Sequence, residues 1–67
     1  MKMTSIRNWK GIIIGWYENR QNGDIFVRDS YKRMLGRYDK SMNVTRDFSG
    51  RIIGQGNLTA MLLPKDK

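Results

Sequence analysis

The sequence contains no cysteine and no histidine, and its only proline is Pro64. Without cysteine there are no disulfides, and without either residue type the usual ligands of structural zinc are missing. The same absences exclude a histidine-dependent triad and a thiol nucleophile. The six Asp and Glu residues are scattered along the chain, and no pair of them is placed for acid–base catalysis. We therefore expect a non-enzymatic protein with no metal, no other cofactor and no small-molecule substrate.

Long hydrophobic runs are also missing. Near the N-terminus the apolar run is only three residues long, Ile12 to Ile14, which is too short for a signal-peptide core or a membrane span. We expect a cytoplasmic protein that does not act at a membrane. With 67 residues the chain is a single domain, 1–67, whose one hydrophobic core supplies roughly 3–5 kcal/mol. Self-association or a bound partner is the remaining source of stability, so we also expect a homo-oligomer.

Acidic residues are few compared with basic ones. Thirteen Lys and Arg residues against six Asp and Glu residues give a formal charge of +7. A positive charge of this size favours a polyanionic partner such as nucleic acid.

A repeat is present in the central part of the chain. Residues 26–38 (FVRDSYKRMLGRY) align with residues 44–56 (VTRDFSGRIIGQG) at a constant spacing of 18. A partial earlier copy, IIIGWY (12–17), aligns with RMLGRY (33–38) at a spacing of 21. The alignment superposes Arg28, Asp29, Arg33 and Gly36 on Arg46, Asp47, Arg51 and Gly54, and places Gly15 and Tyr17 on Gly36 and Tyr38. The unit predicts a short strand, a turn, and a second short strand that ends in glycine.

Turn residues separate the predicted strands. Asn22-Gly23 lies between GIIIGWYE and DIFVRD and predicts a hairpin with a type I′ turn, because both residues tolerate positive φ. In DFSGR (47–51), Asp47 can bond the backbone and Gly50 can adopt the left-handed conformation. DSYKR (29–33) has the same frame without the glycine.

Alternation along the strands predicts two different faces. One face is the better core candidate. The other combines apolar residues with arginines and suits a partner surface, although Trp16 and Phe26 are assigned to the core. The core face contains Ile13, Gly15, Tyr17, Met34, Tyr38 and Ile52, and the mixed face contains Ile12, Ile14, Trp16, Leu35 and Ile53.

Glycines recur near the strand ends at Gly15, Gly36 and Gly54. A glycine within a strand indicates a bulge, a bend or the close approach of another backbone. We therefore predict an all-β fold, a small antiparallel meander or curved sheet or barrel of about five short strands, followed by a short C-terminal helix.

The C-terminal residues 57–63 fit two structures. Asn57 is a good N-cap and Pro64 ends the run, which favours one to two turns of helix. The alternative is a last strand after a turn at Gly56-Asn57. The apolar residues of this segment need a cover and are the candidate oligomer interface: Leu58, Met61 and Leu62.

The arginines of the hairpins outnumber the nearby aspartates. In one interpretation, Asp29 with Arg33 and Asp47 with Arg51 form exposed pairs worth about 0–1 kcal/mol each. In the other, a net positive face binds the phosphates of nucleic acid while aromatic residues stack on unpaired bases. The candidate phosphate-binding residues are Arg28, Arg33, Arg37, Arg46 and Arg51, and the candidate stacking residues are Trp9, Tyr31 and Phe48.

A protein-interaction or assembly module is the alternative function. Here the apolar residues of the mixed face and the C-terminal leucines complete a core across subunits, and open edge strands assist pairing. Binding that weakens steeply with salt would indicate the nucleic-acid function, whereas a hydrophobic assembly would be insensitive to salt.

The run LGRYDKSMNVTRDFSGRIIGQGN (35–57) resembles the repeats of small phage and bacterial β-repeat proteins of the β-flower kind. In those repeats Tyr-Asp, a turn, Gly-Arg and a further Gly recur. The resemblance implies short antiparallel hairpins arranged around an axis, closed here by several subunits, in proteins of poorly defined activity that often come from mobile elements. A small phage or mobile-element protein that acts on a host protein is one form of the alternative assembly function.

Overall fold

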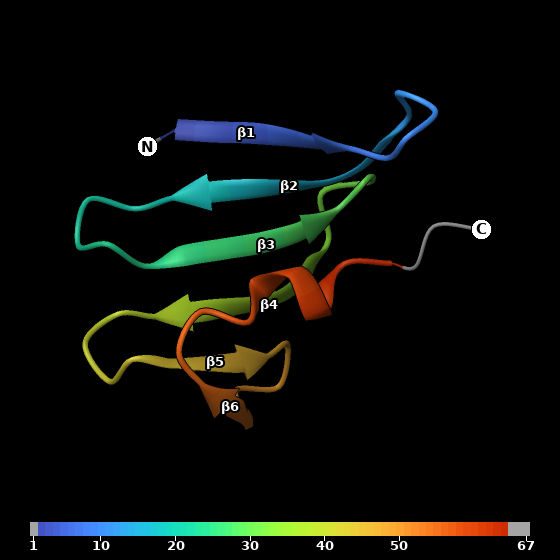
Figure 1. Cartoon of the computed structure of the whole chain (residues 1–67). Helices are drawn as coiled ribbons and strands as arrows, with labels where there is room; N and C mark the ends of the chain where they lie inside the picture. Colours follow the sequence, from blue (N-terminus) through green and yellow to red (C-terminus); the bar gives the residue numbers. More distant parts are fainter. Residues whose placement is uncertain (1, 65–67) are drawn as a thin grey trace.

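The computed structural model describes residues 2–64, which form one antiparallel sheet with its six strands in sequence order (Figure 1). A single 3-10 turn follows the last strand and lies against one face of the sheet. The elements are β1 (Lys2–Arg7), β2 (Ile13–Asn19), β3 (Ile25–Asp29), β4 (Met34–Asp39), β5 (Val44–Asp47), β6 (Ile52–Gln55) and η1 (Thr59–Leu62).

The predicted all-β meander is confirmed, with four corrections. There are six strands rather than five, because the polar segment KMTSIR forms β1 at the sheet edge. The sheet is open, since β1 and β6 each have one neighbour, so it is not a barrel. The C-terminal segment makes one 3-10 turn rather than an α-helix, because Leu63 is already extended before Pro64. The predicted N-cap at Asn57 is wrong: Leu58 is the N-cap residue and makes no side-chain cap, although Asn57 Oδ1, one residue earlier, accepts the N–H of Thr59.

Three of the hairpins have the same turn. In β1–β2, β3–β4 and β5–β6, one residue donates its backbone N–H to the carbonyl of the residue four positions later, at 2.9 Å. The side chain of that first residue accepts two further backbone N–H groups from the turn, as an Asx turn does. The first residues are Asn8, Asp29 and Asp47, and the left-handed residues three positions later are Gly11, Lys32 and Gly50.

An arginine precedes each of these turns and closes it. Arg7, Arg28 and Arg46 donate from Nη1 to the carbonyl oxygens of Gly11, Lys32 and Gly50, at 2.8, 3.1 and 2.9 Å respectively. The duplication predicted for 26–38 and 44–56 is therefore a triplication. Its three copies occupy residues 7–17, 28–38 and 46–56.

The hairpin predicted at Asn22-Gly23 is confirmed, but its turn type differs. Only Gly23 has a positive φ (94°), and the N–H of Arg20 donates to the carbonyl of Asp24 across a three-residue loop. Asn22 stays outside the left-handed region and accepts the N–H of Asp24 with its side chain. This is a type I turn followed by a left-handed glycine, not a type I′ turn.

A β-bulge interrupts the second strand of each repeat. The extra residue lies directly before the glycine of each repeat. Ile14 precedes Gly15, Leu35 precedes Gly36, and Ile53 precedes Gly54. Side chains on the two sides of a bulge no longer alternate. Met34 and Ile52 consequently pair with Arg28 and Arg46 and are exposed, so their assignment to the core is wrong.

The register defines a glycine face. Val27 pairs with Tyr17 and Gly36, and Thr45 pairs with Tyr38 and Gly54, so these residues share one side of the sheet. Val27 and Thr45 are the fully buried side chains at its centre. The Thr45 hydroxyl donates to the carbonyl of Gly56 and accepts the N–H of Leu58, which fixes the start of the C-terminal segment.

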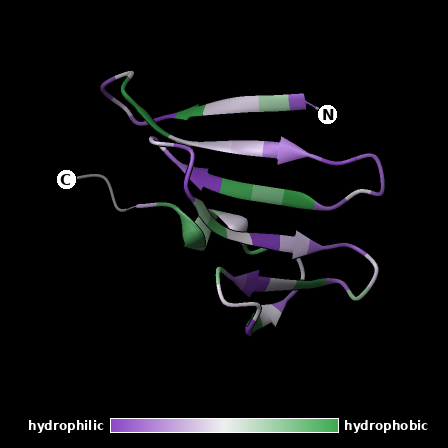
Figure 2. Ribbon diagram, turned by 180° about the vertical axis from the view of Figure 1, so that it is seen from behind, coloured by the Kyte–Doolittle hydropathy of each residue, from purple (hydrophilic) through white to green (hydrophobic). Residues whose placement is uncertain are grey.

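The C-terminal segment covers this face. A Cβ built on Gly15 would lie 2.7 Å from Leu63 Cδ2, and one on Gly36 would lie 2.8 Å from Leu62 Cδ1. A Cβ built on Gly54 would likewise meet Cδ1 of Leu58. The predicted close approach of another backbone is confirmed at Gly15 and Gly36, where the carbonyl oxygens of Arg28 and Arg46 also lie close, and the leucine side chains add a second contact. Figure 2 shows the apolar character of this segment and of β3, in contrast to the hydrophilic β2–β3 turn.

Candidate nucleic-acid interface

The opposite side of the sheet is an arginine face, defined by Arg28, Arg37 and Arg46 with Trp16 and Phe26. Each of these arginines lies beside a buried carboxylate. Arg28 Nε is 2.9 Å from Glu18 Oε1, Arg37 Nη1 is 3.5 Å from Asp24 Oδ2, and Arg46 Nε is 3.5 Å from Asp39 Oδ2.

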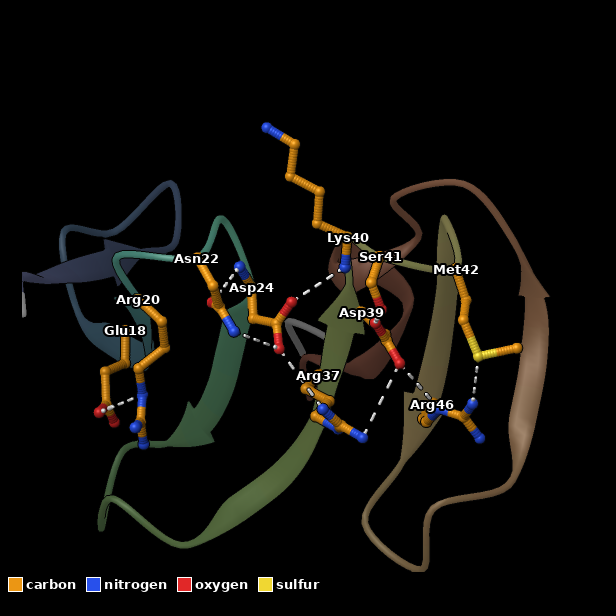
Figure 3. Close-up of polar contacts among 10 residues, drawn as sticks. All are labelled: Glu18, Arg20, Asn22, Asp24, Arg37, Asp39, Lys40, Ser41, Met42 and Arg46. Atoms are coloured by element: carbon orange, nitrogen blue, oxygen red, sulfur yellow. Dashed lines mark hydrogen bonds and ion pairs between the residues drawn. The ribbon is translucent and has the colours of Figure 1, made fainter.

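These pairs form two groups, one of Glu18 with Arg20 and Arg28 and one of Asp24 and Asp39 with Arg37 and Arg46; Figure 3 draws both groups without Arg28. Arg20 Nε lies 3.0 Å from the second oxygen of Glu18, and Arg37 also reaches Asp39 at 4.0 Å. Arg20 and Arg37 lie near the ring of Phe26, at 4.3 and 5.9 Å from its centroid. A hydroxyl hydrogen bond from Ser41 lowers the pKa of Asp39 despite its burial, and Arg37 and Arg46 add to the effect. Asp39 is therefore ionised at neutral pH.

This arrangement changes the expectation for the predicted phosphate-binding residues. The structure brings Arg28, Arg37 and Arg46 together on one face, but their charges are balanced by Glu18, Asp24 and Asp39. Sequence reasoning missed Glu18 and Asp24 as partners. The sequence feature that could have identified them is the predicted hairpin at Asn22-Gly23, because Glu18 precedes this turn and Asp24 follows it.

The other two predicted arginines lie at the ends of hairpins. Arg33 Nε is 2.8 Å from Asp29 Oδ2 while most of its side chain remains exposed. Arg51 forms no ion pair within residues 2–64, and its backbone N–H donates to Asp47 instead. The predicted cross-hairpin ion pair therefore forms at Asp29 and Arg33 but not at Asp47 and Arg51.

The three predicted stacking residues all lie in the repeated turns, Trp9 and Phe48 one residue after the start of the turn and Tyr31 two residues after it. Trp9, Tyr31 and Phe48 are 80%, 81% and 78% exposed, one in each of the repeated turns. The three turns lie at the same end of the sheet, opposite the β2–β3 and β4–β5 turns (Figure 1). We call them the aromatic tips, residues 8–12, 29–33 and 47–51.

Cationic side chains accompany the rings. Lys10 Nζ lies 5.1 Å from the centroid of the Trp9 ring, and Arg33 Cζ lies 5.5 Å from that of Tyr31. Lys10 and Lys32 form no ion pair with any residue in 2–64. The two aspartates of the tips, Asp29 and Asp47, accept hydrogen bonds from the backbone of their own turns. The aromatic tips therefore carry exposed cations that an external anion can reach, although Arg33 is paired with Asp29: Lys10, Lys32, Arg33 and Arg51.

The two tip aspartates are held in their ionised form. At Asp29, burial raises the pKa, but hydrogen bonds from the Arg33 backbone, the Arg33 guanidinium and the Tyr31 backbone outweigh it and lower the pKa. At Asp47, the Ser49 hydroxyl has the largest effect, followed by the Arg51 backbone, and the pKa is again lowered. Asn8 makes the same turn with an amide. The carboxylates thus shape the tips and are not free acids.

The candidate oligomer interface is divided. Leu58 and Leu62 pack on Gly54 and Gly36 of their own sheet, whereas Met61 is 70% exposed. The leucines therefore cover the chain's own core.

Comparisons with protein-family models, with curated proteins and with solved structures found no match. Residues 2–64 contain no cluster of three or more acidic side chains placed to hold a metal ion. Across that same range, no helix has the length and apolar character needed to cross a membrane.

Proposed function

We propose that this chain is a non-enzymatic module that binds single-stranded nucleic acid with its aromatic tips. The observation that supports this most is the threefold repetition of an exposed ring on a braced turn at one end of the sheet, with a cation beside two of the three rings. Exposed rings of this size are costly to keep in water unless a partner covers them.

The chemistry of the tips matches unpaired nucleotides. Base–aromatic stacking contributes about 1–3 kcal/mol per base and is tolerant of sequence. The neighbouring cations can contact the backbone phosphates. The bases of a duplex are already stacked and paired, so protruding rings gain much less from it.

Within this proposal the arginine face has a structural role. Its guanidinium groups are held by Glu18, Asp24 and Asp39, and a phosphate would have to displace these carboxylates. Leaving a buried charge without its partner is costly. The tips can accept an anion without that cost.

The test is fluorescence anisotropy with a short labelled single strand and with the same sequence as a duplex. We expect tighter binding of the single strand and a log–log salt slope of about −0.7 for each phosphate contacted. Lys10→Ala should weaken binding and reduce the slope by about one phosphate. Its matched control is Lys40→Ala, which removes the same charge from the opposite end of the sheet, where the stem of Lys40 lies against Gly23 and its ammonium group forms no ion pair within residues 2–64 (Figure 3). Equal losses for both variants would contradict a role of the tips.

A second candidate function is self-assembly, supported by the exposed apolar residues Ile52 and Ile53 on the open edge strand β6. Unpaired strand edges of this kind can recruit another chain. Sedimentation of the pure protein at low and high salt tests it. Assembly that is insensitive to salt and lost in Ile53→Lys would favour this function over the first.

A further inference from the structure

A cavity of about 380 Å³ opens on the arginine face. Its lining residues come from β1, β2, β3 and the tip of the β3–β4 hairpin: Met3, Glu18, Arg28 and Lys32. Lys32 connects the cavity to the central aromatic tip, since its neighbour Tyr31 is the exposed ring of that tip. The volume of the cavity falls in the range of small-ligand sites.

The polar groups around the cavity that lack partners are hydrogen-bond donors. Both carboxylate oxygens of Glu18 already face guanidinium groups, one from Arg28 and one from Arg20. Lys32 forms no ion pair within residues 2–64, and its Nζ lies 5.2 Å from the centroid of the Trp16 ring. Trp16 lies beside Lys32 but is not a lining residue of the cavity; its indole N–H is buried and has no acceptor within residues 2–64. Buried donors of this kind call for an acceptor from water or a ligand.

We propose that this cavity holds one base of the bound strand, and that it prefers guanine. The inference rests on the proposed function, because Lys32 places the cavity next to the tips. The Met3 side chain supplies an apolar wall for the base. Guanine offers two adjacent acceptors, O6 and N7, to the Lys32 ammonium group, whereas adenine has the amino group N6 beside its N7 and would turn a donor toward that cation.

The test uses the protein's own fluorescence. Trp9→Phe leaves Trp16 as the only tryptophan of the chain and keeps an aromatic ring at the first tip. Titration of this variant with GMP, AMP and inorganic phosphate should quench Trp16 with GMP. AMP should bind about fivefold more weakly or worse, and phosphate alone should have no effect. Equal affinity for GMP and AMP, or quenching by phosphate alone, would overturn the proposal.

Two further variants in the same background locate the site. Met3→Phe fills the cavity, and Lys32→Asn removes the cation while Asn tolerates the left-handed backbone at this position (φ 69°). Both should abolish the GMP response with an unchanged unfolding temperature. Lys40→Asn is the charge control and should keep it. Loss of the response in Lys40→Asn as well, or its survival in Met3→Phe, would contradict the assignment.

Oligonucleotide binding separates the two proposals. If Met3→Phe still binds a non-guanine single strand while GMP leaves Trp16 unchanged in the parent, the cavity proposal fails and the tip proposal stands. If GMP quenches Trp16 but no single strand binds, the cavity is a nucleotide site and the tip proposal fails.

Discussion

Leu62 packs directly on Gly36: a Cβ at Gly36 would lie 2.8 Å from Leu62 Cδ1 and would collide with the carbonyl oxygen of Arg46. Backbone on one side and a core leucine on the other leave no space for a methyl group. The glycine is thus fixed by both its neighbouring strand and the C-terminal segment.

Gly36→Ala should therefore lower the free energy of unfolding by about 2–3 kcal/mol, the usual cost of overpacking a tight site. The measurement is urea unfolding followed by circular dichroism. Gly54→Ala is the graded control, because the added Cβ meets only the flexible side chain of Leu58, and its cost should be smaller. A Gly36→Ala protein as stable as the parent would show that η1 does not pack as described.

These contacts show what the sequence could and could not predict. The glycines at 15, 36 and 54 predicted close approach, but not that leucines from a distant segment add a second contact. The bulges at Ile14, Leu35 and Ile53 invalidated strict alternation, because one inserted residue reverses every later side chain. Two supposed core residues were therefore exposed.

Other errors have a similar origin. β1 was missed because its residues are largely exposed and only pairing with β2 defines it. Glu18 and Asp24 were missed as arginine partners because cross-strand register is not visible in a single sequence. The candidate stacking residues Trp9, Tyr31 and Phe48 are exposed in turns, but their stacking on bases stays a prediction. They lie at one end of the sheet because the first, third and fifth hairpins of a meander all turn at the same end.

The arginine face makes a prediction about stability rather than binding. Arg37→Gln removes the guanidinium group between Asp24 and Asp39, so each of these buried carboxylates loses an ion-pair partner. We expect a loss of about 1–3 kcal/mol in the free energy of unfolding. Single-strand affinity of the folded variant should be unchanged. If Arg37→Gln were as stable as the parent but bound single strands much more weakly, the arginine face and not the tips would be the phosphate-binding site.

The turns predict a specific pH dependence. Asp29, Asp39 and Asp47 have pKa values below the unfolded value of about 3.9. Their contribution to stability is complete above the unfolded pKa and is lost as the pH falls through the folded pKa. The unfolding temperature should therefore fall steeply below about pH 4.

Asp47→Asn tests this at a single turn, since Asn8 forms the equivalent turn naturally. The variant should fold at neutral pH and lose less stability than the parent on acidification, as followed by thermal unfolding at several pH values. Asp47→Ala, which also loses the turn hydrogen bonds, should be less stable at every pH. An unchanged acid profile in Asp47→Asn would mean that this carboxylate contributes nothing to acid unfolding.

The three tips should act as independent and equivalent contacts. Trp9→Ala, Tyr31→Ala and Phe48→Ala each remove one stacking ring, and each should weaken single-strand binding by about 1–3 kcal/mol. The unfolding temperature should stay unchanged, because these rings are almost fully exposed. Anisotropy titrations of the single, double and triple variants measure the effect, and the losses should add because the rings do not share contacts. Met61→Ala removes an exposed apolar side chain outside the tips and should bind like the parent. If one ring accounts for all of the affinity, the repeated turns do not form a common interface, and the function must be sought at that single tip.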